Sequence, residues 1–273
     1  MLTIYSPVQR THRPAYVVKQ GERSASFDVP ERVDSILSAI SKQELGPVIA
    51  PDDAGLEPIR AVHDTGMIEY LMTAYERQNA EAGVSTPVFP TFFPPSGQRR
   101  RPGCFEGQKG SYCTNMGVPI NEDTWKATVA SAHCAIAGAR HLQSGESRVY
   151  ALCRPPGHHA GPDFFGGYCY LNNAAIAAQI LRENGERVAI LDIETTPNRG
   201  DYATASSRTS VLTIAGYQRS KVVRRSSFNT WVRTWSSRWA PFFVQRICCC
   251  FTIRLLTTWF TADSTNPVAM RSP

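Results

Sequence analysis

The sequence predicts an α/β protein built on a parallel sheet with helices on both faces. Two short apolar runs, RVYALC at 148–153 and RVAILDI at 187–193, flank a helical pattern at about 172–184 that is closed by Gly185. A strand, helix, strand unit of this kind is typical of parallel sheets, whose strands are buried on both sides. The 273 residues are 42% hydrophobic and 19% charged, which suits one large core and excludes a disordered or repeat protein.

Three further helices are expected earlier in the chain. Apolar residues recur at one-sided helical spacing from Val33 to Ile40, and Pro30 suits the first turn of that helix. A second helix is predicted at about 66–81, and a long third one begins at Thr124, a residue type favoured at helix N-caps. Between them, the proline-rich stretch 85–120 is expected to be a long loop, and such loops are usually functional or mobile.

Charge and composition divide the chain into two regions. The net charge of +6 separates into −2 for residues 1–193 and +8 for residues 194–273, which hold ten Arg and one Lys against three acidic residues. The second region also has four of the five Trp and no His, and only SVLTIAG at 210–216 has the pattern of a buried strand. We therefore predict an α/β domain at 1–193 and a divergent tail at 194–273, with the sheet incomplete after residue 193.

Composition also bears on location and on cysteine chemistry. No apolar run approaches the ~20 residues of a membrane span, and the first 20 residues lack the apolar stretch of a secretory signal. We expect a cytoplasmic protein without a membrane partner. The eight Cys form no CxxC pair, so neither a disulfide framework nor a zinc knuckle is expected.

Candidate catalytic residues follow the two predicted strands of the strand, helix, strand unit. The motif RPPGHHAG comes directly after the first, and Asp192 lies at the end of the second. Because ligands in such sheets bind beyond the C-terminal ends of adjacent strands, we expect His158, His159 and Asp192 to converge there. Two imidazoles can serve as general acid and base, with a carboxylate to orient one of them. An isolated His pair is more commonly an ordinary loop feature, but the surrounding glycines and aromatics favour the catalytic interpretation.

The segment RPPGHHAGPDFFGGYCYLNNAAIAAQ resembles the active-site segment of the histone deacetylase superfamily, and is most similar to that of bacterial acetylpolyamine amidohydrolases. The resemblance covers about residues 1–193 and includes PERVDSILSAI, VHDTGMIEYL, FEGQKGSYC and VAILDI. It implies an arginase-like α/β fold. It also implies zinc-dependent hydrolysis of a small acetylated amine or an acetyl-lysine substrate, and a homodimer.

The resemblance assigns roles to individual residues. His158 would be the imidazole buried against Asp192, and His159 the general base that takes a proton from water. Tyr168 would line a narrow tunnel for the aliphatic chain of the substrate.

Two more residues receive roles near the substrate. The carbonyl of Gly167 would lie near the substrate nitrogen. Glu106 would lie at the tunnel mouth, where a carboxylate suits a cationic polyamine. A solvated loop charge is an equally good interpretation of Glu106.

The chain departs from the family where the metal ligands are expected. The family continues its strand as Asp-x-Asp-x-His-His-Gly-Asn-Gly, whereas here Glu194 replaces the second aspartate and Thr196 the first histidine. Glu194 is the only metal ligand we assign, because a threonine hydroxyl is a poor zinc ligand and no His follows His159. Either the tail is a genuine divergent extension, or it is translated in a shifted reading frame, which we favour.

Two other functions compete with an impaired deacetylase. One is a metal-free pseudoenzyme that binds acetylated or cationic ligands, and bound zinc would distinguish the two. The other is single-strand nucleic-acid binding by the Arg- and Trp-rich segment 219–239, which strongly salt-dependent binding would support. We consider nucleic acid an improbable partner, because an unstructured or mistranslated segment explains the same composition.

Overall fold

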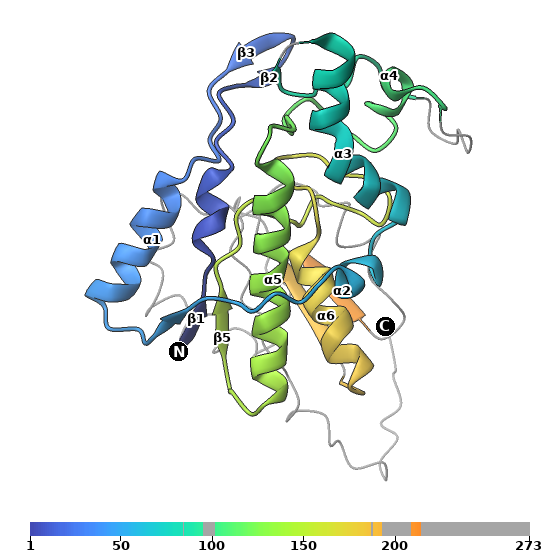
Figure 1. Ribbon diagram of the computed structural model, residues 1–273. Helices are drawn as coiled ribbons and strands as arrows, with labels where there is room; N and C mark the ends of the chain where they lie inside the picture. Colours follow the sequence, from blue (N-terminus) through green and yellow to red (C-terminus); the bar gives the residue numbers. More distant parts are fainter. Residues whose placement is uncertain (84, 95–101, 187, 193–208, 214–273) are drawn as a thin grey trace, which may run out of the picture.

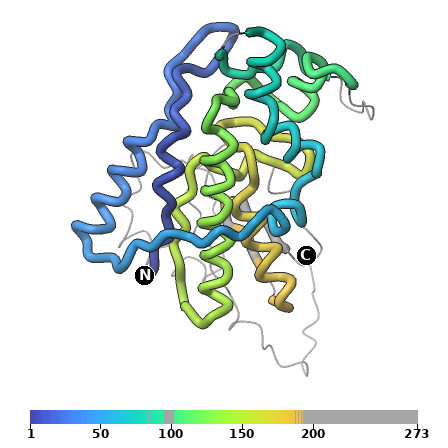
Figure 2. The backbone as a smooth tube through the Cα atoms, in the orientation of Figure 1, coloured from blue at the N-terminus to red at the C-terminus, as the bar shows by residue number. Residues whose placement is uncertain are grey.

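The computed structural model describes residues 1–83, 85–94, 102–186, 188–192 and 209–213. Figures 1 and 2 show this part of the chain in colour. Its central element is a parallel sheet of three strands in the order β4–β1–β5, formed by Val48–Ile49, Leu2–Ile4 and Val149–Ala151. The register aligns Leu2 with Val149 and Ile4 with Ala151.

Helices cover both faces of this sheet, as the sequence predicts. On one face Ile4, Val149 and Ala151 pack with residues of α5 (Thr124–Gln143) and α6 (Asn173–Glu183). On the other face Tyr5 and Leu152 pack with α1 (Glu31–Lys42). Successive strand residues point to opposite faces, so the alternation of Val149, Tyr150, Ala151 and Leu152 supplies both layers.

One more long helix lies beyond one end of the sheet, as Figure 1 shows. The third helix, α3, spans Thr65–Ala82; Asp64 caps it by accepting a hydrogen bond from the Met67 N–H, and Gly83 ends it at φ 64°. Short helical segments are η1 (Pro7–Thr11), α2 (Glu57–Arg60) and α4 (Phe105–Gln108). An antiparallel hairpin joins β2 (Val17–Lys19) to β3 (Glu22–Ser24).

Two expectations about local structure need correction. The N-cap of α5 is Asp123 rather than Thr124; the Thr124 hydroxyl instead accepts a hydrogen bond from the Asn121 N–H at 2.8 Å. The expected loop at 85–120 also contains α4. Within the described residues, no helix has the length and apolar character of a membrane span.

The predicted strands at 187–193 and 210–216 are present as β6 (Val188–Asp192) and β7 (Thr209–Thr213). They pair in parallel, with Asp192 aligned with Thr213. The expectation that β5 and β6 are adjacent strands is wrong for the described residues, where β5 pairs with β1 and β6 pairs with β7. The helix between these strands, α6, packs on β6. The strand, helix, strand unit therefore forms without hydrogen bonds between β5 and β6 in the described residues. Apart from β7, the expected tail lies outside the described residues.

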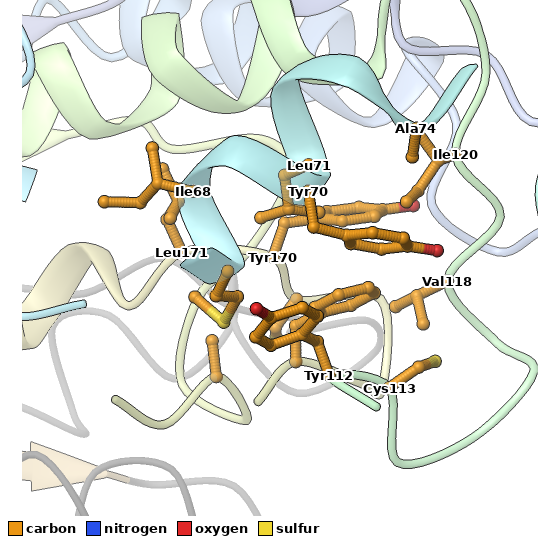
Figure 3. Packing of buried hydrophobic residues seen from close by; sticks show 14 of the residues in the cluster. Ile68, Tyr70, Leu71, Ala74, Tyr112, Cys113, Val118, Ile120, Tyr170 and Leu171 are labelled. Atoms are coloured by element: carbon orange, nitrogen blue, oxygen red, sulfur yellow. The ribbon is translucent and has the colours of Figure 1, made fainter. Parts of the chain in front are cut away.

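An aromatic cluster fills the core between α3 and the loops that carry Tyr112 and Tyr170 (Figure 3). The ring of Tyr70 stacks on Tyr112 at 5.4 Å between centroids, and Phe165 stacks on Tyr170 at 5.8 Å. The hydroxyl of Tyr170 donates to the Pro119 carbonyl at 2.7 Å, so its polar end is satisfied inside the core. This cluster supports the loop that follows β5.

Candidate active site

The loop after β5 is anchored near its start by a buried arginine. Arg154 is 3% exposed, and its Nε donates to Asp28 Oδ1 at 3.0 Å. Its other nitrogens donate to the backbone carbonyls of Gln9, His12 and Asp28. The Arg154 N–H donates to Gln9 Oε1 at 2.9 Å. A charge this deeply buried is tolerated only when it is paired and hydrogen-bonded, so this network fixes where the loop begins.

The same loop is tied to α5 and α6 on its other side. The carbonyl of Pro155 accepts from the Ser131 hydroxyl at 2.8 Å and from Asn173 Nδ2 at 3.3 Å. Gly157 lies directly against the start of α6, where an added Cβ would be 2.3 Å from the Leu171 carbonyl oxygen. Only glycine fits there, which accounts for the Pro-Pro-Gly turn of the motif.

A buried histidine closes the loop at its far end. His63 Nδ1 donates to the Gly161 carbonyl at 2.8 Å, while His63 Nε2 accepts from the Asn172 N–H at 2.9 Å. Burial lowers the pKa of His63 to about 4, in keeping with a neutral ring that donates at one nitrogen and accepts at the other. Asn172 also donates to the Ala160 carbonyl at 2.9 Å and caps α6. His63 therefore joins the two ends of the stretch 161–172, which follows the two imidazoles and carries Gly167 and Tyr168.

His158 and Asp192 meet as the sequence predicts. His158 Nδ1 lies 3.2 Å from Asp192 Oδ2, and the two residues are 2% and 3% exposed. A hydrogen bond from Nδ1 to a carboxylate sets the ring orientation and tautomer. The two strand ends thus supply one site although the strands themselves are not neighbours.

His159 lies beside this pair and is half-buried. Its ring centroid is 4.1 Å from that of His158, with the planes inclined by 42°. Burial, and secondarily the charge of a protonated His158, lower the pKa of His159 to about 4, while Asp192 acts in the opposite direction. The ring is therefore neutral near pH 7, the form in which an imidazole accepts a proton.

Gly167 and Tyr168 form the wall next to His159. An added Cβ on Gly167 would be 2.4 Å from His159 Cδ2, so the glycine backbone lies directly against the imidazole. Gly167 and Tyr168 both have positive φ, at 56° and 67°. The Tyr168 hydroxyl is buried and has no hydrogen-bond partner among the described residues. The two residues are thus contiguous with the imidazoles, as expected; their substrate roles remain predictions.

Glu106 lies apart from this group in its contacts. It is in α4, its side chain is 53% exposed, and it forms an ion pair with Lys109 Nζ at 2.6 Å. The Thr91 hydroxyl donates to its carboxylate at 2.8 Å. Hydrogen bonds from Lys109 and Thr91 lower the pKa of Glu106. These contacts satisfy the carboxylate without a ligand and leave its proposed role at the tunnel mouth a prediction.

The expected metal ligand Glu194 lies outside the described residues. Within the part of the chain that the structure describes, no three His, Cys, Asp or Glu side chains are grouped so that they could hold a metal ion. Asp192, the carboxylate at the site, is hydrogen-bonded to His158. The described donors therefore do not fit the three-ligand set of a catalytic zinc.

Sequence reasoning missed several residues that position the site. Arg154 belongs to the recognised motif, but nothing in the pattern shows that Asp28 and Gln9 are its partners. Nor does the pattern show that His63 bonds to Gly161 and Asn172. Lys19, whose Nζ lies 5.6 Å from the ring centroid of Tyr168, was also missed. Lone polar residues outside the long helices carry no periodic signal that could have identified them.

Comparison with known proteins places this geometry in a family. The histone deacetylase domain family matches residues 26–223. The chain is 42% identical over 198 residues to acetylpolyamine amidohydrolase 1 of Pseudomonas aeruginosa, a match covering 71% of this chain and 57% of that protein. It is 40% identical over 196 residues to the acetylpolyamine amidohydrolase of Mycoplana ramosa, again covering 71% and 57%. The chain thus spans less than two thirds of the length of these relatives.

A solved structure supports the same family assignment. The crystal structure of acetylpolyamine aminohydrolase from Burkholderia pseudomallei superimposes with a TM-score of 0.74 at 36% identity, covering 79% of this chain and 63% of that one. This confirms the arginase/deacetylase-like α/β fold that the resemblance implies. From the match over residues 26–223 and these relatives, we conclude that the chain belongs to the histone deacetylase family.

Proposed function

We propose that this site hydrolyses the amide of a small acetylated amine, with His159 as the general base. The observation that carries the proposal is the buried His158–Asp192 hydrogen bond beside a neutral, half-buried His159. A base of this kind needs an unprotonated nitrogen near the reacting water and a neighbour that holds it in place. Similarity to acetylpolyamine amidohydrolases supports the acetylated amine as the substrate class.

The proton and bond changes follow from these roles. His159 accepts a proton from water as the water oxygen bonds to the acetyl carbon. The carbon–nitrogen bond then breaks and the departing nitrogen takes that proton; the acetic acid formed gives its own proton to the amine, so that acetate and an alkylammonium ion leave. Asp192, whose charge favours the protonated form of His159, supports the positive charge that develops on that imidazole, and it holds His158 in place beside it. The carbonyl of Gly167 accepts a hydrogen bond from the substrate N–H, and Tyr168 packs against its methylenes.

Family resemblance implies zinc as the cofactor. The described part of this chain offers too few ligands for it. The described donors do not complete a zinc site, and Thr196 stands where the family has a histidine. Without the several kcal/mol that a metal contributes to stabilising developing charge, His159 alone supports only slow turnover. We therefore expect slow hydrolysis at high enzyme concentration.

The test is acetate release from N-acetylputrescine and from an acetyl-lysine peptide, followed by mass spectrometry at enzyme excess. His159→Ala should abolish the release. His141→Ala, a histidine in the last turn of α5, should leave it unchanged. Release that survives in His159→Ala would overturn the proposal.

A second candidate is ligand binding without turnover, and the replacement at Thr196 favours it. Binding of N-acetylputrescine that is saturable and requires His159, without acetate release on any timescale, would establish this function instead.

A further inference from the structure

A lysine of the chain itself lies on the aromatic wall of the site. Lys19 is the last residue of β2, and its Nζ is 4.4 Å from the ring centroid of Phe27 and 5.6 Å from that of Tyr168. Phe27 is 68% exposed, far more than a phenylalanine that serves only the core. The ammonium therefore bridges an exposed aromatic side chain and the residue that follows Gly167.

This position connects the charge to the imidazoles through two neighbouring residues. The backbone of Gly167 packs on the ring of His159, and Tyr168 is the next residue. An aromatic face attracts a cation through its quadrupole, so Phe27 and Tyr168 would suit the ammonium of a ligand. In this chain Lys19 already occupies that position. A ligand that brings a second ammonium must displace Lys19 or be repelled by it.

Nearby charges leave the lysine poorly compensated. No ion pair formed by the described residues includes Lys19; Glu22 is its register partner across the hairpin. The other acidic candidate, Glu106, has its carboxylate paired with Lys109 at 2.6 Å. Lys19 is thus a charged side chain that contacts the ring of Tyr168 directly and is not neutralised by an ion pair among the described residues.

We propose that Lys19 is a specificity-determining residue that makes the site prefer acetylated ligands with a neutral or anionic far end over those that end in an ammonium. The proposal rests on the proposed function, because it assumes that the acetamide binds beside His159. It predicts the opposite preference from the one that Glu106 at the tunnel mouth would impose.

Three ligands isolate the charge at the far end. N-acetylputrescine, N-pentylacetamide and 5-acetamidopentanoate share an acetamide and four methylenes, and end in an ammonium, a methyl and a carboxylate. Titration calorimetry at low ionic strength would give the Kd of each for the full chain. The unmodified protein should bind the carboxylate most tightly and the ammonium most weakly. Lys19→Gln should shift the ratio of those two Kd values by roughly fivefold toward the ammonium, and Lys19→Glu should shift it further and reverse the order.

Two controls separate this effect from general changes. Lys42→Glu makes the same change in net charge at the end of α1 and should leave the ratio unchanged. The Kd of N-pentylacetamide should be the same in all variants. Binding of all three ligands with a ratio that Lys19→Glu does not move would overturn the role of Lys19 alone. Failure of all three ligands to bind any variant would overturn the proposed function, and the role of Lys19 with it.

Discussion

The base of the candidate site and its rim are built from the same kinds of side chain in opposite environments. At the base, formed by Gln9, Asp28, His63 and Arg154, charged and polar groups are buried and held by several hydrogen bonds each. We call Lys19, Tyr168 and, by its predicted role, Glu106 the rim; the charged groups of Lys19 and Glu106 are exposed and make fewer contacts. Buried charges are costly to leave unpaired, whereas exposed ones contribute little to stability. The base therefore sets stability and geometry, and the rim is free to set ligand preference.

The largest effect is expected at the centre of the base. Arg154→Met leaves the Asp28 carboxylate buried without its main partner, and burial already raises the pKa of Asp28. The free energy of unfolding should fall by about 3–5 kcal/mol, measured by urea denaturation. The matched control is Arg13→Met, which removes an exposed ion pair with Glu31 and should cost under about 1 kcal/mol. Equal losses in the two variants would contradict the distinction between base and rim.

His63→Phe should cost about 2–3 kcal/mol, because the Gly161 carbonyl and the Asn172 N–H lose their buried partner. The same residue makes a prediction about pH. The pKa of His63 is lowered from 6.5 to about 4, so between these values the unfolded chain binds the proton and the folded chain does not. The contribution of His63 to stability is thus present above pH 6.5 and lost as the pH falls toward 4.

His12 and His159, whose pKa values are also lowered, act in the same direction. The dependence of the unfolding free energy on pH from 7 to 4 should consequently be shallower in His63→Phe than in the unmodified protein. An unchanged slope would show that His63 does not titrate as its burial requires.

Gly167 lies between the two regions, and an alanine there should have an intermediate effect. The added Cβ would lie 2.4 Å from His159 Cδ2, on a backbone with φ of 56°. We expect a loss of about 2–3 kcal/mol together with reduced ligand binding, because the imidazole must move. Gly83→Ala has a similar φ of 64° with open space around the Cβ, and should cost only about 1 kcal/mol. Equal costs in the two variants would mean that contact with His159 is unimportant.

The smallest effect is expected at the rim. Glu106→Gln removes the charge of a half-exposed carboxylate from the Lys109 side chain, which is only 10% exposed; because the Gln amide oxygen can still accept a hydrogen bond from Lys109, stability should fall by about 1 kcal/mol by thermal denaturation. A loss above about 2 kcal/mol would place Glu106 with the base rather than the rim.

The difference between base and rim also explains what the sequence could predict. Apolar spacing anticipated α1, α3, α5 and α6 to within a few residues, as well as β5, β6 and β7, because these elements are set by local pattern and burial. The convergence of His158 with Asp192 followed from the rule that strand ends share an edge. That rule succeeded although β5 and β6 do not pair within the described residues.

Long-range polar contacts were not predictable in the same way. Arg154 meets Asp28 across 126 residues of sequence, and His63 meets Asn172 across 109. Such pairs have no period and no fixed spacing, so only the folded chain shows them. The hairpin that presents Lys19 has strands of three residues each, too short to give a clear alternation.

The central claim is that the imidazoles and Asp192 are assembled as hydrolysis requires, and that the slow turnover we propose arises from the residues beyond 193 that replace the family's metal ligands. The most direct test is the zinc content of the purified protein after dialysis, measured alongside acetate release with and without a chelator. We predict substoichiometric, weakly held zinc in the unmodified chain, and partial recovery of zinc affinity when Glu194→Asp and Thr196→His are combined. Tightly held zinc at one ion per chain, with chelator-sensitive turnover in the unmodified protein, would contradict the claim and show that other residues of this chain complete the metal site.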